Sequence, residues 1–245
     1  MDFTIKLAGK NILVSSLFDE VYSLCRDYLT DSTPDIKISI VPEDIEYERF
    51  KSVQESKIEG IPIVDYSDSY LETLAVYRKI ATKMLNYDTM LMHGSVVAVD
   101  DKAWLFTAPS GTGKTTHINL WLDNIPGSFV VNGDKPLIRV SEEIVAFGTP
   151  WAGKEGMQRN TGIRLCGIVF LERAQSNSIE KVAFSQVLPE LIQQSFRPVD
   201  KQDLERTLGL ITELGKHIPL YKLKCNMDSE AARVAYEGLF GGGED

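Results

Sequence analysis

Residues 103–121 read AWLFTAPSGTGKTTHINLW, and this stretch decides the class of fold. The apolar run 104–106 predicts a short buried strand, and the residues from His117 onward continue as a helix. A loop with two glycines, which contains the string SGTGKTT, joins the two elements. A strand, a glycine-rich loop and a helix in this order are typical of a phosphate-binding loop in an α/β protein.

The residue types in this loop suit a nucleotide polyphosphate. Glycines at 111 and 113 let backbone N–H groups point inward without Cβ clashes, and the new helix places the positive end of its dipole at the same point. Lys114 would reach the β- and γ-phosphates of ATP, and Thr115 would offer its hydroxyl to Mg²⁺. The nucleotide-binding residues expected from the string are Ser110, Gly111, Thr112, Gly113, Lys114, Thr115 and Thr116.

One position departs from the usual form of the loop. The first glycine of the motif normally lies five residues before the second, and Ala108 stands at that position here. Pro109 restricts Ala108 to extended conformations, so the chain enters the loop slightly differently. The simpler interpretation, a glycine-rich turn that caps a helix, stays open.

Two further residues near the loop carry candidate chemistry. The apolar run 96–99 predicts a strand that turns through two aspartates into the loop strand, and His93 stands at the start of this hairpin. The apolar run 129–131 predicts another strand, and Asp134 lies just beyond its end, where a carboxylate commonly holds Mg²⁺. Structural roles remain the alternative for both: a packed histidine for His93, and a turn aspartate for Asp134.

A long glycine-containing loop follows at 147–160, reading FGTPWAGKEGMQRN. Long loops in compact domains are often functional lids. Lys154 and Arg159 lie on this loop, and two cations there would neutralise charge on a transferring phosphoryl group. A surface loop with solvated charges is the alternative. The segment 163–173 then predicts a buried strand.

Composition and charge exclude several classes of function. The chain has 245 residues, with 26 basic and 35 acidic side chains and a formal net charge of -9. An acidic chain lacks the basic face that broad binding of nucleic acid or anionic membranes requires, so we expect neither as a partner. No segment approaches the roughly 20 apolar residues of a membrane span, and the N-terminus lacks the layout of a signal peptide. The three cysteines form no CxxC pair, which argues against a zinc site or a disulfide framework and favours a cytoplasmic location.

The patterns divide the chain into two parts. Residues 1–66 predict a small N-terminal α/β subdomain, with a helix over 17–29 and a strand–turn–strand over 57–65. Residues 67–245 predict the domain that carries the phosphate-binding loop, and this domain begins with a largely buried helix from Asp68. A homo-oligomer is compatible with these patterns, which do not set the oligomeric state.

The segments around the loop resemble the HPr kinase/phosphorylase family and its relatives in the phosphoenolpyruvate-carboxykinase-like group. The resemblance lies in HGSVVAV at 93–99, APSGTGKTTH at 108–117, NGDKP at 132–136 and the loop 154–160, and it covers about residues 90–175. It implies an α/β fold with a P-loop-containing, HPr-kinase-like core, and an ATP-dependent phosphotransferase activity. ATP-dependent phosphoenolpyruvate carboxykinase carries a similar loop, which we interpret as shared ancestry of the nucleotide site.

The resemblance also implies roles for single residues. His93 lies next to the phosphoryl-transfer centre in such kinases, and Asp134 takes the position of the metal-binding aspartate. The family often shows a second, adjacent aspartate that acts on the acceptor hydroxyl, and Gly133 stands at that position here. Arg159 and Asn160 match the family's basic loop best.

We therefore expect an ATP- and Mg²⁺-dependent kinase that transfers the γ-phosphoryl group to a hydroxyl, with Ser or Thr of a peptide or small protein as the leading acceptor. The expected catalytic residues are His93, Asp134, Lys154 and Arg159, and the expected metal ligands are Thr115 and Asp134. A small-molecule kinase that acts on free serine or a sugar is one alternative. A nucleotide-binding pseudokinase is another, because a glycine at 133 cannot act as a base.

Overall fold

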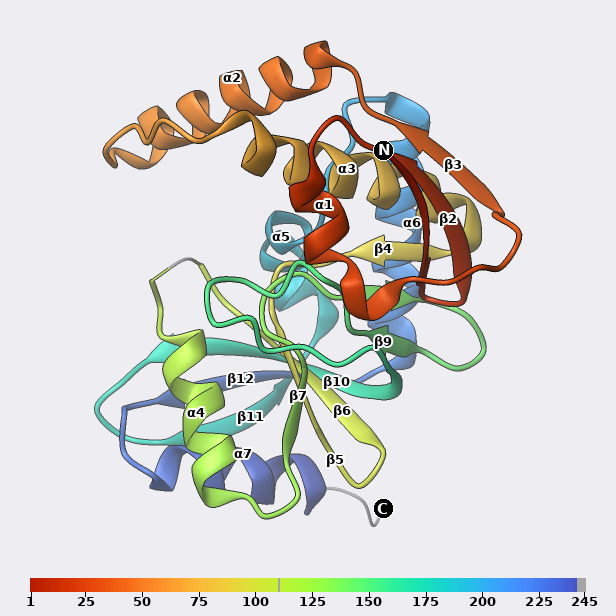
Figure 1. Cartoon of the computed structure of the whole chain (residues 1–245). Coiled ribbons are helices and arrows are strands. Elements are labelled where there is room, and N and C mark those ends of the chain that lie inside the picture. Colours follow the sequence, from red (N-terminus) through yellow and green to blue (C-terminus); the bar gives the residue numbers. More distant parts are fainter. Residues whose placement is uncertain (110, 242–245) are drawn as a thin grey trace. The chain divides into compact units, whose positions relative to one another are not determined.

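The computed structural model describes residues 1–109 and 111–241, and the chain forms two compact units, Met1–Met84 and Leu85–Asp245 (Figure 1). The sequence placed the boundary near residue 66, whereas the structure divides later, between Met84 and Leu85. The reason is helix α3 (Asp68–Met84), which packs against the other helices of the first unit and so belongs to it.

The first unit combines a three-stranded sheet with helices. Its strands follow one another in the sheet as β1 (Asp2–Leu7), β2 (Lys10–Ser15) and β3 (Ile36–Ser39). Its helices are α1 (Asp19–Leu24), the 3₁₀ helix η1 (Arg26–Tyr28), α2 (Pro42–Glu59) and α3. Strands β1 and β2 are antiparallel, and β3 pairs parallel to β2. Ile36 and Ile38 are buried while Lys37 is exposed, as the period-2 spacing predicts.

Two sequence-based predictions in this unit need correction. The helix expected over 17–29 is shorter, because α1 ends at Leu24 and η1 follows it. The strand–turn–strand expected over 57–65 is wrong: α2 continues to Glu59, and Gly60 ends it in the left-handed conformation with φ of 67°. Residues 61–67 carry neither helix nor strand, and Ile61 and Ile63 are exposed. The alternating apolar residues there have no sheet to join.

The second unit is a mixed α/β structure built on a nine-stranded sheet. Its strands are β4 (Thr89–Leu91), β5 (Ser95–Val99), β6 (Lys102–Thr107), β7 (Phe129–Asn132), β8 (Leu137–Arg139), β9 (Val145–Phe147), β10 (Gly162–Arg173), β11 (Ser178–Val182) and β12 (Leu220–Cys225). Its helices are η2 (Leu85–Tyr87), α4 (Lys114–Asn124), α5 (Phe184–Gln194), α6 (Lys201–His217) and α7 (Glu230–Phe240). The strand order is β4-β8-β9-β10-β6-β5-β7, and β12 pairs with β10 and β11.

Both parallel and antiparallel pairs occur in this sheet. Strand β10 runs parallel to β6 and to β12, whereas β5 is antiparallel to β6 and to β7. Strands β6 and β7 therefore point the same way on either side of β5. Their carboxyl ends, and the amino end of β5, lie along one edge of the sheet. The loop between β6 and α4 starts at this edge, so the topology brings the predicted phosphate loop, His93 and Asp134 to one place.

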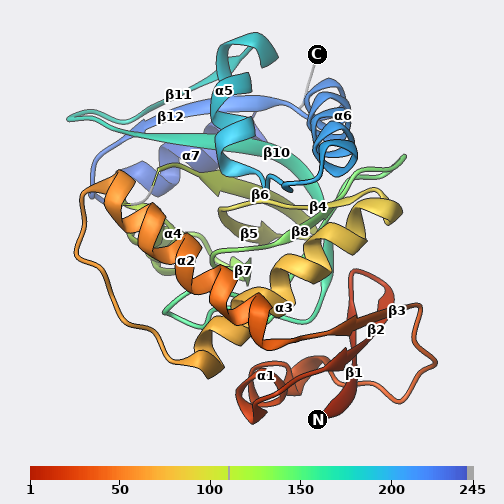
Figure 2. The same ribbon diagram turned by 90° about the horizontal axis from the view of Figure 1, so that it is seen from above.

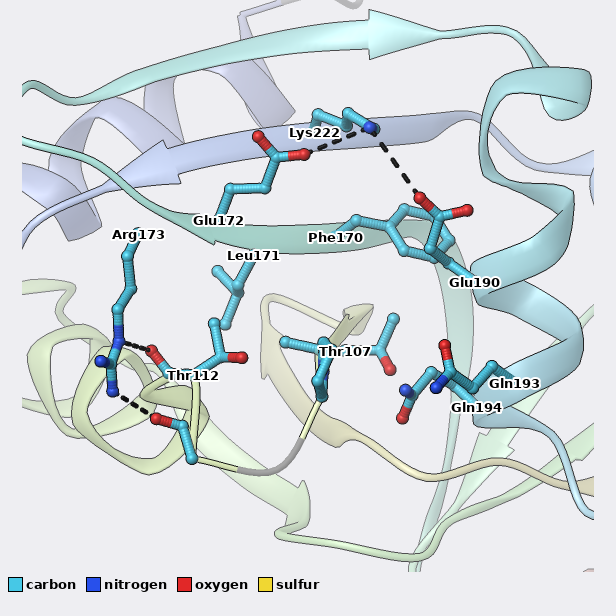
Figure 3. Close-up of a pocket in the computed structure, with 13 residues that line it drawn as sticks. Thr107, Thr112, Phe170, Leu171, Glu172, Arg173, Glu190, Gln193, Gln194 and Lys222 are labelled. Carbon is cyan, nitrogen blue, oxygen red and sulfur yellow. Dashed lines mark hydrogen bonds and ion pairs between the residues drawn. The ribbon is translucent and has the colours of Figure 1, made fainter. Parts of the chain in front are cut away.

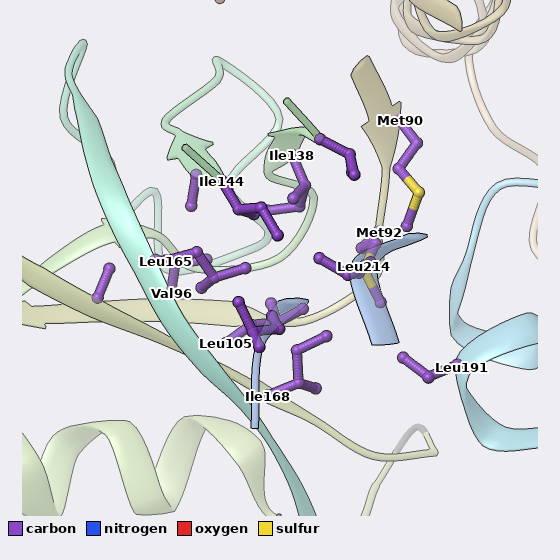
Figure 4. Close-up of a cluster of buried hydrophobic side chains, with 14 of the residues drawn as sticks. Met90, Met92, Val96, Leu105, Ile138, Ile144, Leu165, Ile168, Leu191 and Leu214 are labelled. Carbon is purple, nitrogen blue, oxygen red and sulfur yellow. The ribbon is translucent and has the colours of Figure 1, made fainter. Parts of the chain in front are cut away.

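Helices cover both faces of the sheet. Helices α4 and α7 lie side by side on one face (Figure 1), and α5 and α6 lie on the other (Figure 2). Alternate residues of the central strands enter the two cores: Val96 and Leu105 pack under α5 and α6, while Val97 and Phe106 pack under α4 and α7. Figure 4 shows the first of these cores, which includes Leu191 and Leu214 from the helices.

Aromatic packing fixes helix α4 on the sheet. Trp121 is fully buried, and its ring meets that of Phe106 edge to face, with centroids 5.3 Å apart. Such a pair contributes about 1 kcal/mol beyond the burial of its area. Because Phe106 lies at the end of β6 and Trp121 lies on α4, both sides of the intervening loop are anchored in one core.

Across residues 1–109 and 111–241, every helix is too short or too polar to cross a membrane.

Candidate functional site

In the loop between β6 and α4, both glycines have the positive φ angles that the sequence leads us to expect. Gly111 and Gly113 have φ angles of 77° and 115°, in the left-handed region that favours glycine. A Cβ at either position would meet no atom within 4 Å, so the requirement for glycine is conformational rather than steric. Helix α4 begins directly after Gly113 without a side-chain cap, and Thr115 and Thr116 are exposed in its first turn. Ser110, also predicted to bind nucleotide, lies outside the described residues.

Lys114 folds back over the start of the loop. Its Nζ donates a hydrogen bond to Ala108 O at 3.0 Å, so its ammonium group lies on the inner side of the turn. Burial lowers the pKa of Lys114 below its ordinary value, and the negative charge of Asp134 opposes that shift. This electrostatic coupling links the loop lysine to the carboxylate that follows β7.

His93 and Asp134 form a direct pair at the same edge of the sheet. His93 Nε2 lies 3.2 Å from Asp134 Oδ1, and His93 Nδ1 lies 2.8 Å from Gln194 Oε1 at the end of α5. The Gly94 amide donates to Asp134 O at 2.8 Å, and Thr107 Oγ1 donates to His93 O at 2.8 Å. The imidazole thus lies between Asp134, in the turn after β7, and Gln194 of α5, while Thr107 holds the backbone of His93.

The turn after β7 is made by Asn132 rather than by Asp134. Asn132 Oδ1 accepts hydrogen bonds from the amides of Asp134 and Lys135, at 2.9 and 2.7 Å, and its Nδ2 donates to Thr149 O at 3.0 Å. The turn therefore does not depend on the Asp134 carboxylate, which faces His93 instead. Of the two roles that the sequence left open for Asp134, the turn role belongs to Asn132, and the carboxylate stays available for a ligand.

Several charges act on the Asp134 carboxylate. Burial alone would raise its pKa, but the hydrogen bond from His93 and the charges of Lys135, His93 and Lys114 outweigh burial and hold the pKa below its usual value. The group is therefore an anion near neutral pH. Its side chain keeps 27% of its surface exposed, so it remains accessible to a ligand.

The loop after β9 packs its backbone against this turn. A Cβ on Gly133 would lie 2.8 Å from Ala152 O and 3.3 Å from Met157 O, so backbone fills the space that a side chain at 133 would need. Gly153 lies against Asp134, because a Cβ there would come within 3.1 Å of Asp134 Cβ. The position at which the resembled family carries a second aspartate is sterically closed here.

The two cations predicted on this loop have different surroundings. Lys154 is exposed and follows Gly153, the residue that contacts Asp134. The Arg159 guanidinium stacks over the ring of Phe129, with its Cζ 4.2 Å from the ring centroid. Phe129 begins β7, whereas Asp134 follows the end of that strand. The structure therefore brings together His93, Asp134 and Lys114, but it does not bring Arg159 to them.

The donor set fits a magnesium ion that is shared with phosphates. Mg²⁺ prefers oxygen ligands and is commonly held by one or two protein groups together with water and substrate phosphates. Thr115 offers an exposed hydroxyl, and Asp134 offers an ionised carboxylate. The part of the chain that the structure describes contains no cluster of three or more His, Cys, Asp or Glu side chains able to hold a metal by themselves. These two residues are the ones that would hold Mg²⁺.

His117, in the first turns of α4, is a buried neutral histidine. The Trp121 indole N–H donates to His117 Nε2 at 3.0 Å, so the proton of the neutral ring is on Nδ1. Burial lowers the pKa of His117 to about 4. Its ring also packs against that of Phe106 of β6, with centroids 5.2 Å apart, and so joins α4 to the core.

This burial makes the stability of the second unit depend on pH. Because the unfolded state takes up a proton near pH 6.5 and the folded state only near pH 4, stability is complete above pH 6.5 and falls as the pH drops towards 4. Over this range we expect the free energy of unfolding of the wild type to fall by about 3 kcal/mol, and we expect this fall to be absent in His117→Gln. Urea unfolding followed by tryptophan fluorescence at several pH values measures it, since all three tryptophans lie in this unit. His217→Gln, at an exposed site on α6, is the matched control, and equal pH dependence in wild type and His117→Gln would contradict the assignment.

Sequence reasoning missed three residues that organise the site. Asn132 builds the turn, Gln194 orients His93, and Arg173 at the end of β10 bonds to the loop itself. The sequence could have indicated Arg173, because this residue ends a predicted strand and ligands bind at the edge where the carboxyl ends of parallel strands meet. Gln194 carried none, because it lies far from His93 in the sequence and meets it only through the fold.

A cavity of about 540 Å³ adjoins the loop on the side of α5 (Figure 3). It is lined by Thr107 and Thr112, by Gln193 and Gln194 of α5, and by charged residues of β10, α5 and β12. Lys222 lies 3.2 Å from Glu172 and 4.0 Å from Glu190 across it. Gln194, which lines the cavity, also contacts His93, so one residue of the cavity wall touches the histidine.

The sequence matches no protein-family model, and no curated protein matches it. Among solved structures, the chain is similar to the Hpr(Ser) kinase/phosphatase from Coxiella burnetii, with a TM-score of 0.36 and 10% sequence identity over 62% of this chain and 93% of that chain. At this TM-score, nothing about the activity of this chain follows from the similarity.

Proposed function

We propose that this chain is an ATP- and Mg²⁺-dependent phosphotransferase of the HPr-kinase-like kind, which transfers the γ-phosphoryl group to a hydroxyl. The observation that carries the proposal is the placement of the His93–Asp134 pair beside the glycine loop, with Asp134 and Lys114 electrostatically coupled. A lysine, inward-facing amides and an accessible carboxylate are the groups that phosphoryl transfer uses for positioning and charge neutralisation.

Each residue has a distinct part in the proposed reaction. The loop amides and Lys114 hold the β- and γ-phosphates. Thr115 and Asp134 would hold Mg²⁺, which when bound would supply charge neutralisation at the phosphates. The acceptor oxygen forms a bond to the γ-phosphorus while the bond to the β–γ bridging oxygen breaks, so that ADP leaves. The hydroxyl proton passes to Nε2 of a neutral His93, and the Asp134 carboxylate beside Nε2 stabilises the imidazolium that forms. Gln194 Oε1, which faces Nδ1, keeps the ring aligned. Lys154 is the cation of the neighbouring loop assigned to the transferring group.

The acceptor enters from the cavity beside α5 in this proposal. Its volume of about 540 Å³ and its contact with both the loop and Gln194 suit a Ser or Thr side chain presented by a peptide or a small protein. Free serine or a sugar is the small-molecule alternative, and it would occupy only part of this space.

A second candidate function, nucleotide binding without catalysis, is favoured by the surroundings of Gly133. The backbone of the neighbouring loop occupies the space in which the resembled family places its base. If the His93–Asp134 pair does not accept the hydroxyl proton, the chain binds nucleotide without turnover.

Two measurements test the proposal. Calorimetry with MgATP measures binding, and incubation with γ-labelled ATP and either cell extract or a set of metabolites detects phosphorylated product. We expect binding in the first and a labelled peptide or protein in the second. A labelled metabolite would support the small-molecule kinase, binding without any product would support the nucleotide-binding module, and no association with millimolar MgATP would refute all three.

A further inference from the structure

We infer that Arg173 is a positioning residue that orients the phosphate-binding amides of the loop; this rests on the proposed nucleotide function. Arg173 is the last residue of β10. In the parallel pairing with β6, Phe170 lies opposite Thr107, the residue where β6 ends. Strand β10 therefore extends past the end of β6 and runs beside the loop that follows it.

The extended end of β10 is a rigid support. Arg173 pairs with Cys225 of β12, and the Ala174 amide donates to Cys225 O at 3.0 Å. The arginine backbone is thus part of the sheet, and its side chain starts from a fixed point.

The guanidinium holds two successive carbonyl groups of the loop (Figure 3). Arg173 Nε donates to Thr112 O at 2.9 Å, and Nη2 donates to Gly111 O. In a planar trans peptide, the C=O and the following N–H point in opposite directions. Fixing the carbonyls of residues 111 and 112 therefore aims the amides of Thr112 and Gly113 away from Arg173. The Thr112 amide accordingly reaches Pro109 O within the loop, over a long 3.3 Å contact that a phosphate oxygen can replace.

The loop needs such an outside support because its glycines are permissive. Gly111 and Gly113 reach positive φ at no steric cost, but glycine equally allows other backbone conformations. Arginine is suited to the task, since its planar group presents several donors in a fixed fork, whereas lysine offers one compact charge. The adjacent carboxylate does not compete: Glu172 pairs with Lys222, and within residues 1–109 and 111–241 no carboxylate forms an ion pair with Arg173.

The test compares Arg173→Met and Arg173→Lys with Arg164→Met, an exposed arginine on the same strand β10 but distant from the loop. Calorimetry measures the Kd for MgATP and, as a phosphate-containing probe without a nucleoside, for magnesium pyrophosphate. ADP formation with water as acceptor gives KM and kcat. We expect Arg173→Met to raise Kd and KM by roughly 10- to 100-fold, with a much smaller change in kcat, because the amides bind ground state and transition state alike. Arg173→Lys should recover part of the affinity, and Arg164→Met should behave as wild type.

Two outcomes separate the failure of this inference from failure of the proposed function. If wild type binds MgATP and both Arg173 variants bind it equally well, the positioning role is wrong while the proposed function stands. If wild type binds neither probe, the proposed function itself fails. Thermal unfolding shows whether each variant folds; should Arg173→Met not fold, Arg173→Lys decides, and wild-type affinity in that variant overturns the inference.

Discussion

Asp134→Asn is expected to lower the rate of ADP formation from MgATP by roughly 10²- to 10³-fold, while ATP without magnesium binds as in wild type. Asparagine keeps the size of the side chain and leaves the turn intact, because Asn132 makes the turn hydrogen bonds. The substitution removes the negative charge that is coupled to Lys114 and paired with His93. Steady-state kinetics, together with calorimetry in the presence and absence of magnesium, measure both effects.

The control for this variant is Asp123→Asn, which removes an exposed carboxylate from α4 and should leave the rate unchanged. A rate within about threefold of wild type for Asp134→Asn would remove this carboxylate from the reaction, since the loss of a group that stabilises transition-state charge costs far more.

Lys114→Ala is expected to reduce nucleotide turnover by roughly 10²-fold or more and to weaken MgATP binding as well. The ammonium group is the only charge that the described part of the loop supplies on its inner side, and its bond to Ala108 O holds it there. The same assay of ADP formation and the same calorimetry measure the change.

Lys181→Ala, on an exposed position of β11, is the matched control and is expected to retain wild-type turnover. Turnover by Lys114→Ala equal to that of this control would show that the loop is not a phosphate site.

The sequence was most informative where structure is local. The strand β6, the glycine loop and helix α4 were predicted because their patterns lie within a single stretch of chain, and β10 was predicted from one apolar run. The backbone angles of Gly111 and Gly113 agree with the reason given for those glycines. The meeting of His93 and Asp134 follows from the strand order, which periodicity could not supply; the resemblance gave roles to both residues but not that order.

The remainder of the site depends on contacts that no local pattern encodes. Gln194 reaches His93 only because α5 ends beside the hairpin. The Arg159 guanidinium stacks on the ring of Phe129 and not at the expected phosphate site, and no local pattern predicts that contact. The expected boundary near residue 66 differs from the division between the two compact units for a related reason: the buried side of α3 can pack on any apolar neighbour, and the sequence does not say which.

The closed space at Gly133 limits how this protein could change during evolution or design. Because the carbonyls of Ala152 and Met157 already lie where a side chain would project, introducing aspartate there would push two backbone segments apart rather than add a proton acceptor. A side chain at position 133 is thus possible only if the backbone of the facing loop changes at the same time. Reaching the two-aspartate arrangement from this chain would require remodelling of the loop first, so no path of single substitutions at this position alone leads there.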